Sequence, residues 1–401
     1  MDSRHKFLVV ASSTLLVALL LIGSLLGKNA SSADGAYPQL SVFTQVLTRI
    51  KSEYVEEPDM KSVSIGAVNG LLESIDPYAS YLNPEQFQEY QRARGAHKGD
   101  AGLILSKKFG YLGVVGAVPG SAAEKAGLAT GDMIESIGGI TTRDMPLAYA
   151  GLMLQGEPGS AVEISAVRVR RSTEPQKIEL TRAVLKPPAV EFRLLGDSIG
   201  YVRPATLAAG KVKEAAAAIE SLQKQGARRL ILDLRNTAVG AADQGVALAN
   251  LFVSSGTLAY LQGQRVPRQN FDAEAGRAMS SLPLAVLVNR GTADGAEIAA
   301  AALLEHKRAE VVGERTYGDA ALRRPVTLED GSAVILSVAK YYSPNGKAIQ
   351  DTGVTPGTLV AEVEAQVELD ENGEAVPQSE PEPQTLDDPI LKKAIEGIRN
   401  R

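Results

Sequence analysis

The sequence predicts a multidomain protein of mixed α/β and α+β type, and three observations support this. The chain has 401 residues, of which 44% are hydrophobic and 22% charged, enough for two or three domains with separate cores. An uncharged apolar run stands near the amino end. After it, helical periodicity gives way to short β-rich runs and then to alternating strands and helices. We expect five segments: a membrane segment (1–33), a helical region (34–96), a β-rich module (97–186), an α/β body (187–360), and an acidic linker with a short helix (361–401).

Composition excludes several functions. The formal net charge of −5 gives no cationic surface for phosphate backbones, so we expect no nucleic-acid partner. The chain has no cysteine, which rules out disulfides, thiolate zinc sites and cysteine nucleophiles. This composition is compatible with an oxidising envelope compartment. We expect no cofactor and no metal.

The amino end predicts export. Arg4, His5 and Lys6 precede an uncharged run from Phe7 to Gly27, which is long enough to span a bilayer. The positive-inside rule then predicts a single-pass inner-membrane anchor with a periplasmic or other extracytoplasmic body. The alternative is a signal peptide cut after Ala33, which would release a secreted protein.

The segment behind this run is predicted to form two amphipathic helices, one around 40–54 and one around 65–75. Apolar residues recur there at helical spacing, and Pro58 and Pro77 lie in the turns that end the helices. We interpret this region as a packing or dimerisation element and assign it no chemistry.

The β-rich module contains a distinctive stretch from Val118 to Ile134. Ser121 is placed to cap a short helix reaching Lys125, Gly127 to end it in a left-handed conformation, and Gly131-Asp132 to turn the chain into a strand over 133–137. This stretch closely resembles a PDZ domain. The resemblance implies that an extended peptide adds to a sheet edge while backbone amides hold its terminal carboxylate.

The edge expected to receive the peptide is Gly102, Leu103, Ile104 and Leu105, facing a helix around 146–154 that contributes Ala150 and Leu154. The alternative is an apolar edge packed against the rest of the molecule.

The body is predicted to be a mixed α/β sheet. Short apolar runs at 230–235 and 284–288 are typical of buried strands, and 244–252 and 296–304 are typical of helices. Together with the segments before it, the body resembles the carboxyl-terminal processing peptidases (tail-specific proteases), a PDZ-containing serine peptidase family. The resemblance spans about Gln39 to Val360. It rests on the runs at 291–298, 313–319, 341–350 and 353–356, in the family's order.

The departures from this family concern its catalytic residues. The resemblance places the nucleophilic serine at Asp294 and the lysine that activates it at Asp319, with the family's spacing of 25 residues kept. The family's glutamine four residues after the lysine is Arg323. The oxyanion region is Val239, Gly240 and Gly295, with Val239 where a glycine is expected.

A serine/lysine hydrolase needs a hydroxyl, a neutral amine and oxyanion donors. An aspartate in place of each dyad member supplies neither of the first two groups, and two neighbouring carboxylates raise one another's pKa. We expect Arg323 to form an ion pair with Asp294 or Asp319.

Other chemistry stays open at this point. Thr292 is a conceivable non-standard nucleophile, and Asp351-Thr352-Gly353 matches the aspartic-protease signature. A metal site built from Asp294, Asp319 and either Glu297 or Glu314 would suit a hard cation. His306 is interpreted as a polar residue at a helix end.

The tail combines an acidic, proline-containing linker with an amphipathic helix over 390–398, capped by Asp388-Pro389. The helix could dock on its own body or on a partner.

The sequence therefore predicts a catalytically inactive peptidase homologue that binds carboxyl termini of envelope proteins. It would act as an adaptor or as a regulator of an active relative. Its expected protein partners are such a relative or further copies of this chain. An active endopeptidase and a structural envelope scaffold are the alternatives.

Overall fold

The computed structural model describes residues 36–93, 99–108, 110–143, 145–168, 174–362 and 388–399. The chain divides into two compact units, Met1–Ala67 and Val68–Arg401. No helix in the described ranges is both long and apolar enough to span a bilayer. The apolar run at 7–27 lies outside these ranges, so the membrane anchor stays a prediction.

The described part of the chain begins with two helices, as the periodicity predicts. Helix α2 spans Ala36–Glu53 and α3 spans Met60–Ile75. Much of the apolar stripe of α2 is exposed, including Leu40 and Val46.

The β-rich module contains a six-stranded sheet, a two-stranded sheet in which β2 pairs with β7, and two short helices. The path β3-β4-β5-β8-β9 makes β3 an edge strand, and β6 pairs with β5. The Oγ of Ser121 accepts from the N–H of Glu124 at 3.2 Å, and Gly127 and Gly131 have positive φ, as the sequence predicts. The elements are β2 (Gly99–Asp100), β3 (Leu103–Lys108), β4 (Tyr111–Ala117), α5 (Ala122–Lys125), β5 (Met133–Ile137), β6 (Ile140–Thr141), α6 (Leu147–Leu154), β7 (Gln155–Gly156), β8 (Ala161–Val167) and β9 (Gln176–Thr181).

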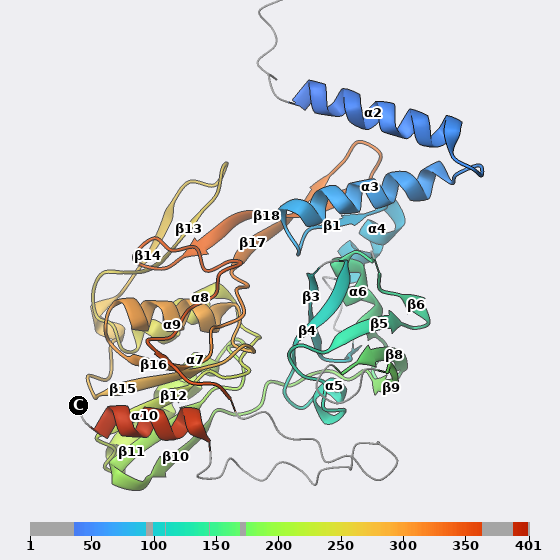
Figure 1. The fold of residues 1–401 in the computed structure, drawn as a ribbon. Coiled ribbons are helices and arrows are strands. Elements are labelled where there is room, and N and C mark those ends of the chain that lie inside the picture. The colour runs from blue at the N-terminus through green and yellow to red at the C-terminus, as the bar shows by residue number, and fades with distance from the viewer. Residues whose placement is uncertain are drawn as a thin grey trace, which may run out of the picture. The chain divides into compact units, whose positions relative to one another are not determined.

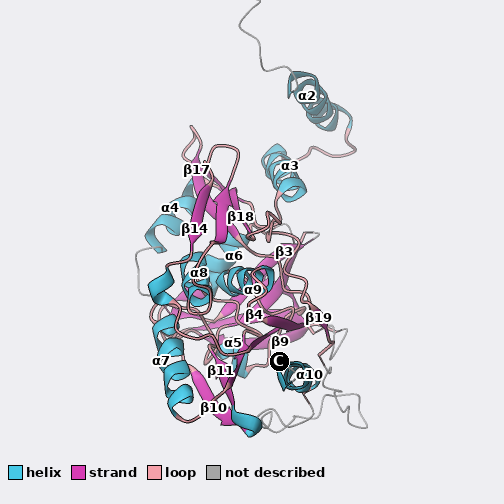
Figure 2. Ribbon diagram, turned by 90° about the vertical axis from the view of Figure 1, so that its left-hand side faces the viewer, coloured by secondary structure: helices cyan, strands magenta, loops and turns pink. Residues whose placement is uncertain are grey.

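The body contains a second six-stranded sheet, in the order β10-β11-β12-β15-β16-β19 (Figures 1 and 2). Strand β10 is antiparallel to β11 and the other pairs are parallel. Helices α7, α8 and α9 cover one face and α10 the other. The elements are β10 (Glu191–Leu195), η1 (Gly196–Ser198), β11 (Ile199–Arg203), α7 (Lys211–Lys224), β12 (Arg229–Asp233), α8 (Ala242–Asn250), β15 (Leu284–Val288), α9 (Gly295–Glu305), β16 (Glu310–Gly313), β19 (Thr358–Leu359) and α10 (Pro389–Arg399).

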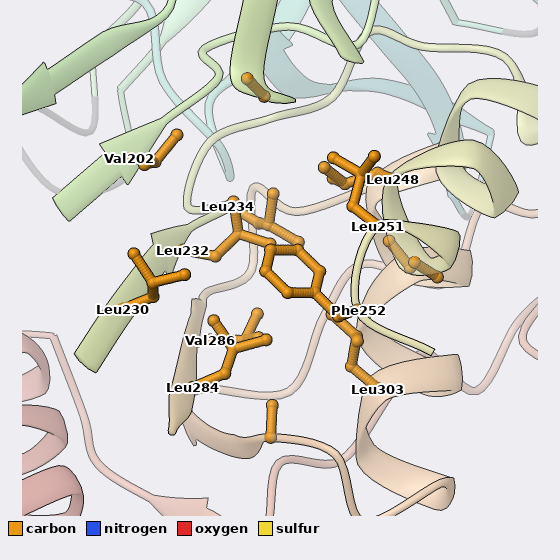
Figure 3. Close-up of a cluster of buried hydrophobic side chains, with 14 of the residues drawn as sticks. Val202, Leu230, Leu232, Leu234, Leu248, Leu251, Phe252, Leu284, Val286 and Leu303 are labelled. Carbon is orange, nitrogen blue, oxygen red and sulfur yellow. The ribbon is translucent and has the colours of Figure 1, made fainter. Parts of the chain in front are cut away.

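The largest hydrophobic core lies between this sheet and helices α7, α8 and α9. Figure 3 shows side chains of β12 and β15, among them Leu230, Leu232 and Val286, facing Phe252 and Leu303. All five of the β15 residues are buried, which explains why the run reads as continuously apolar.

Helix α10 docks on its own body, which decides the question that the sequence leaves open. Its buried face, Ile390, Leu391, Ala394 and Ile398, packs against the opposite face of the sheet. At its start, Asp388 forms a 2.7 Å ion pair with the buried Arg235, which also binds Asp233.

A third sheet supplies the segments beside the candidate site. Strand β18 (Ala333–Tyr342) pairs with β1 (Ser80–Leu82), β17 (Ala321–Thr327) and β13 (Thr257–Gln262), and β13 pairs with β14 (Gln269–Asp272). Helix α4 (Pro84–Ala93) and the short η2 (Ala275–Arg277) complete the described elements.

Candidate functional site

Asp294 lies where strand β15 turns into helix α9, at the carboxyl edge of the parallel sheet. Its φ of 54° and ψ of −127° are unusual for a residue with a side chain. The buried hydroxyl of Thr292 donates to the carbonyl of Leu234 at 2.9 Å, and this hydrogen bond fixes the turn. A strained residue at a strand-to-helix turn is the geometry of a nucleophile elbow. Here that position carries a carboxylate.

Asp319 lies beside Asp294, although 25 residues separate them in the sequence. The N–H of Asp294 donates to the carbonyl of Asp319 at 3.0 Å. The carboxylate of Asp319 forms a 2.5 Å ion pair with Arg323, whose guanidinium lies 4.1 Å from the centre of the Tyr78 ring. Arg323 therefore pairs with Asp319, one of the two partners that the sequence predicts. The position where the family resemblance predicts the lysine thus holds an aspartate that forms an ion pair with Arg323.

The loop that carries Asp319 is fixed by Glu297, one turn into α9. Its carboxylate is fully buried and accepts from the hydroxyl of Thr316 and from the N–H groups of Gly318 and Asp319, the latter two at 2.8 Å. Burial raises the pKa of Glu297 to about 8. The three donors favour the charged form and act in the opposite direction, but burial has the larger effect. Sequence reasoning considered Glu297 only as a metal ligand and missed this role. The available signal is a carboxylate in the first turn of an alanine-rich helix whose other first-turn residues are apolar or glycine.

Burial raises the pKa of Asp294 to about 7, and the charge of Asp319 adds to the rise. Arg323 acts in the opposite direction but does not cancel it. Near neutral pH Asp294 is thus partly protonated. A protonated carboxylic acid is a weaker nucleophile still than a carboxylate, and neither resembles an activated serine.

The oxyanion region is bonded within the chain. The N–H of Gly295, which follows the elbow residue, donates to the carbonyl of Gly240 at 3.0 Å. The carbonyl of Val239 accepts from the N–H of Leu207 at 2.6 Å. The Gly295 donor would have to leave Gly240 before it could stabilise an oxyanion.

The other candidate residues have structural roles. The hydroxyl of Thr292 is buried and already donates. Asp351 forms an ion pair with Lys340, and Glu314 with Arg290. His306 ends α9, and its Nε2 lies 2.9 Å from the carbonyl of Thr257. In the described ranges no cluster of three or more His, Cys, Asp or Glu side chains could hold a metal ion.

Comparison with known proteins identifies the scaffold. Residues 198–360 match the model of peptidase family S41, and 113–168 match that of the PDZ domain. A carboxyl-terminal-processing protease of Synechocystis sp. is 32% identical over 319 residues, covering 78% of this chain and 74% of that protein. The chain belongs to this protease family.

Two further relatives agree. The carboxy-terminal processing protease of Bacillus subtilis is 30% identical and covers 87% of this chain and 75% of its own length. The solved structure of a photosystem II D1 C-terminal processing protease has a TM-score of 0.67 at 30% identity, over 86% of this chain and 92% of that one.

The expected peptide edge lies in the PDZ domain. Strand β3 is an edge strand next to α6, as predicted. Leu103, Ala150 and Leu154 are buried in the core of the PDZ domain, and Leu105 packs against that core. Ile104 instead packs against a cluster in which Val115 of β4 meets Ala238 and Ala293 of the peptidase body. Part of the expected peptide edge therefore contacts the body next to Asp294.

The glycine loop also makes internal bonds. The N–H of Gly102 donates to the carboxylate of Asp100 at 2.6 Å, and the N–H of Ala101 donates to the carbonyl of Leu154 at 3.1 Å. Gly102 has φ of 85°, and a Cβ there would lie 2.1 Å from that of Ser121. A ligand carboxylate reaching Gly102 would have to displace Asp100.

Proposed function

We propose that this protein is a non-cleaving member of the carboxyl-terminal processing proteases, which binds protein carboxyl termini through its PDZ domain. The proposal rests on one observation: the nucleophile elbow is intact, but Asp294 occupies it and Asp319 is neutralised by Arg323. Hydrolysis by this family's route needs a hydroxyl and a base that can remove its proton. Neither group stands at the elbow.

The alternative of an active enzyme with another nucleophile finds little support. Thr292 is the nearest hydroxyl in sequence, and it is fully buried and bonded to Leu234. Access for a substrate carbonyl would require the turn under Asp294 to open.

The binding half of the proposal relies on the outer edge of β3, with which no strand among the described residues pairs. A peptide strand can add there, and α6 lies alongside to receive side chains. With cleavage lost, such binding would hold a carboxyl terminus without consuming it. An adaptor or a regulator of an active relative in the cell envelope fits this behaviour, and a membrane anchor at the amino end would keep it there.

The test is the binding of a labelled peptide that ends in apolar residues, offered to the full chain with a free or an amidated carboxyl end. The free acid should bind more tightly. Asp100→Asn should tighten its binding further, because the amide oxygen still accepts from Gly102 while the charge that repels a carboxylate is gone.

Leu105→Asp serves as the matched loss variant on the peptide edge. Equal binding of the acid and the amide, with no effect of either substitution, would favour the structural scaffold over the adaptor.

A further inference from the structure

A cavity of about 930 Å³ lies between the PDZ domain and the body. Its lining includes Ser106 of β3 but neither Asp294 nor residues 102–105 of the expected peptide edge. Its PDZ side includes Tyr111, Val114 and Met133. Its body side includes Arg290, Arg315 and the run 359–361. A concave, mostly apolar site with a few polar groups is the usual form of a ligand site.

The body side offers positive charge. Arg315 is exposed, and no ion pair or side-chain hydrogen bond of Arg315 occurs within the described part of the chain. Arg290 pairs with Glu314 at 3.3 Å but keeps most of its side chain in solvent. Glu362 directly follows the lining run 359–361, and its carboxylate accepts a hydrogen bond from the side-chain amide of Asn289 at 3.0 Å. A carboxylate entering the cavity would therefore find Arg315 available.

The same side offers backbone groups. Strand β19 is the last strand of its sheet, and no described strand pairs with its outer edge. Thr358 and Val360 face β16, since the N–H of Val360 donates to the carbonyl of Gly313 at 3.0 Å. Alternate residues of a strand direct their N–H and C=O groups to opposite sides, so those of Leu359 face outward. The Leu359 side chain is 70% exposed.

We propose that this cavity is a second peptide site, which binds an extended acidic peptide as an added strand on the free edge of β19. Alternate residues of such a peptide point to opposite faces. Its apolar side chains would contact Tyr111 and Met133, and its carboxylates would bind Arg315. This site needs no free carboxyl terminus, which separates it from the PDZ edge and from the function proposed above.

The test uses the full chain and a fluorescent, amino-acetylated and carboxyl-amidated peptide of alternating valine and glutamate, followed by anisotropy. Amidation removes any terminal carboxylate that the PDZ edge could capture. The peptide should bind, and Arg315→Glu should weaken it about tenfold or more, because a charge-assisted hydrogen bond becomes a repulsion.

Leu359→Pro tests strand addition separately. It removes only an N–H that faces away from the sheet, where proline is tolerated. It should weaken binding as well, while Arg228→Glu, a charge reversal at an exposed arginine outside the cavity lining, and a lysine-for-glutamate peptide serve as controls. The first should leave binding unchanged and the second should not bind.

Absence of binding, or binding that neither Arg315→Glu nor Leu359→Pro affects, would overturn the proposal. So would binding that appears only after residues 363–387 are deleted, because the occupant would then be the chain's own acidic segment. Loss of carboxyl-terminal binding at the PDZ edge, with this site intact, would overturn only the adaptor proposal.

Discussion

At the scale of single residues, the backbone of Asp294 keeps a conformation suited to a nucleophile while its side chain cannot act as one. The pKa of about 7 and the neighbouring Asp319–Arg323 pair are two consequences of burying charge in a site shaped for other groups. The effect of the raised pKa and the effect of the ion pair can each be measured as a change in the free energy of unfolding.

Asp294→Asn should stabilise the fold, and the gain should depend on pH. The folded pKa lies above the ordinary 3.8, so the native state favours the protonated form, and stability falls as pH rises from about 4 to 7. The asparagine side chain does not ionise, so the variant does not lose stability in this way. Urea unfolding should show a gain of about 1–3 kcal/mol at pH 8 and much less at pH 4.

Asp330→Asn is the control of opposite sign, since a hydrogen bond from Ser332 lowers the pKa of Asp330. Its folded state favours the charged form, so this variant should lose stability above pH 4. An equal gain for Asp294→Asn at both pH values would contradict the assignment of a raised pKa.

Arg323→Gln introduces the residue that the family resemblance implies at this position. It should destabilise this chain by about 1–3 kcal/mol, because the largely buried Asp319 loses its partner. The double variant Asp319→Asn, Arg323→Gln should recover much of the loss. Arg49→Gln breaks an ion pair of the same i,i+4 spacing that is exposed on α2, and should cost little. Equal costs for the two arginines would mean that the Asp319 pair is not structural.

At the scale of elements, α8 and α9 approach each other through glycine. A Cβ on Gly245 of α8 would lie 2.0 Å from the carbonyl oxygen of Gly295, the residue after the elbow. Gly245→Ala should therefore destabilise the protein by about 1–3 kcal/mol. Gly151→Ala in α6 meets nothing within 4 Å and should stabilise by about 0.5–1 kcal/mol. Thermal denaturation of both variants gives the comparison; a Gly245→Ala variant as stable as wild type would place the two helices further apart.

Helix α10 makes a second prediction at this scale. Ile390 is fully buried against the sheet, whereas Ile395 is only partly buried on the same helix. Ile390→Ala should cost about 2–4 kcal/mol and Ile395→Ala clearly less. Chemical denaturation tests the order, and faster amide exchange in α10 of the Ile390 variant would locate the effect. Similar small costs at both positions would show that α10 is not firmly docked.

At the scale of the whole molecule, much of the arrangement follows from local sequence. The β15 strand, the Ser121 cap and the Gly127 and Gly131 turns occur where periodicity and turn chemistry place them. The candidate site at positions 294 and 319 can be proposed from the sequence because the family resemblance rests on motifs at these two positions. Long-range pairing was less accessible, since Glu297 holding the 316–319 loop and Arg235 binding Asp388 depend on tertiary contacts that no local pattern encodes.

The central claim is that this scaffold binds without cutting, and proteolysis tests it most directly. The full chain is incubated with an unfolded protein that has an apolar carboxyl terminus, in parallel with Asp294→Ala and with the Asp294→Ser, Asp319→Lys double variant, and the products are read by mass spectrometry. The natural chain should leave the substrate intact, because the elbow offers only a partly protonated carboxyl. Cleavage by the natural chain that survives Asp294→Ala would reveal another nucleophile and contradict the account.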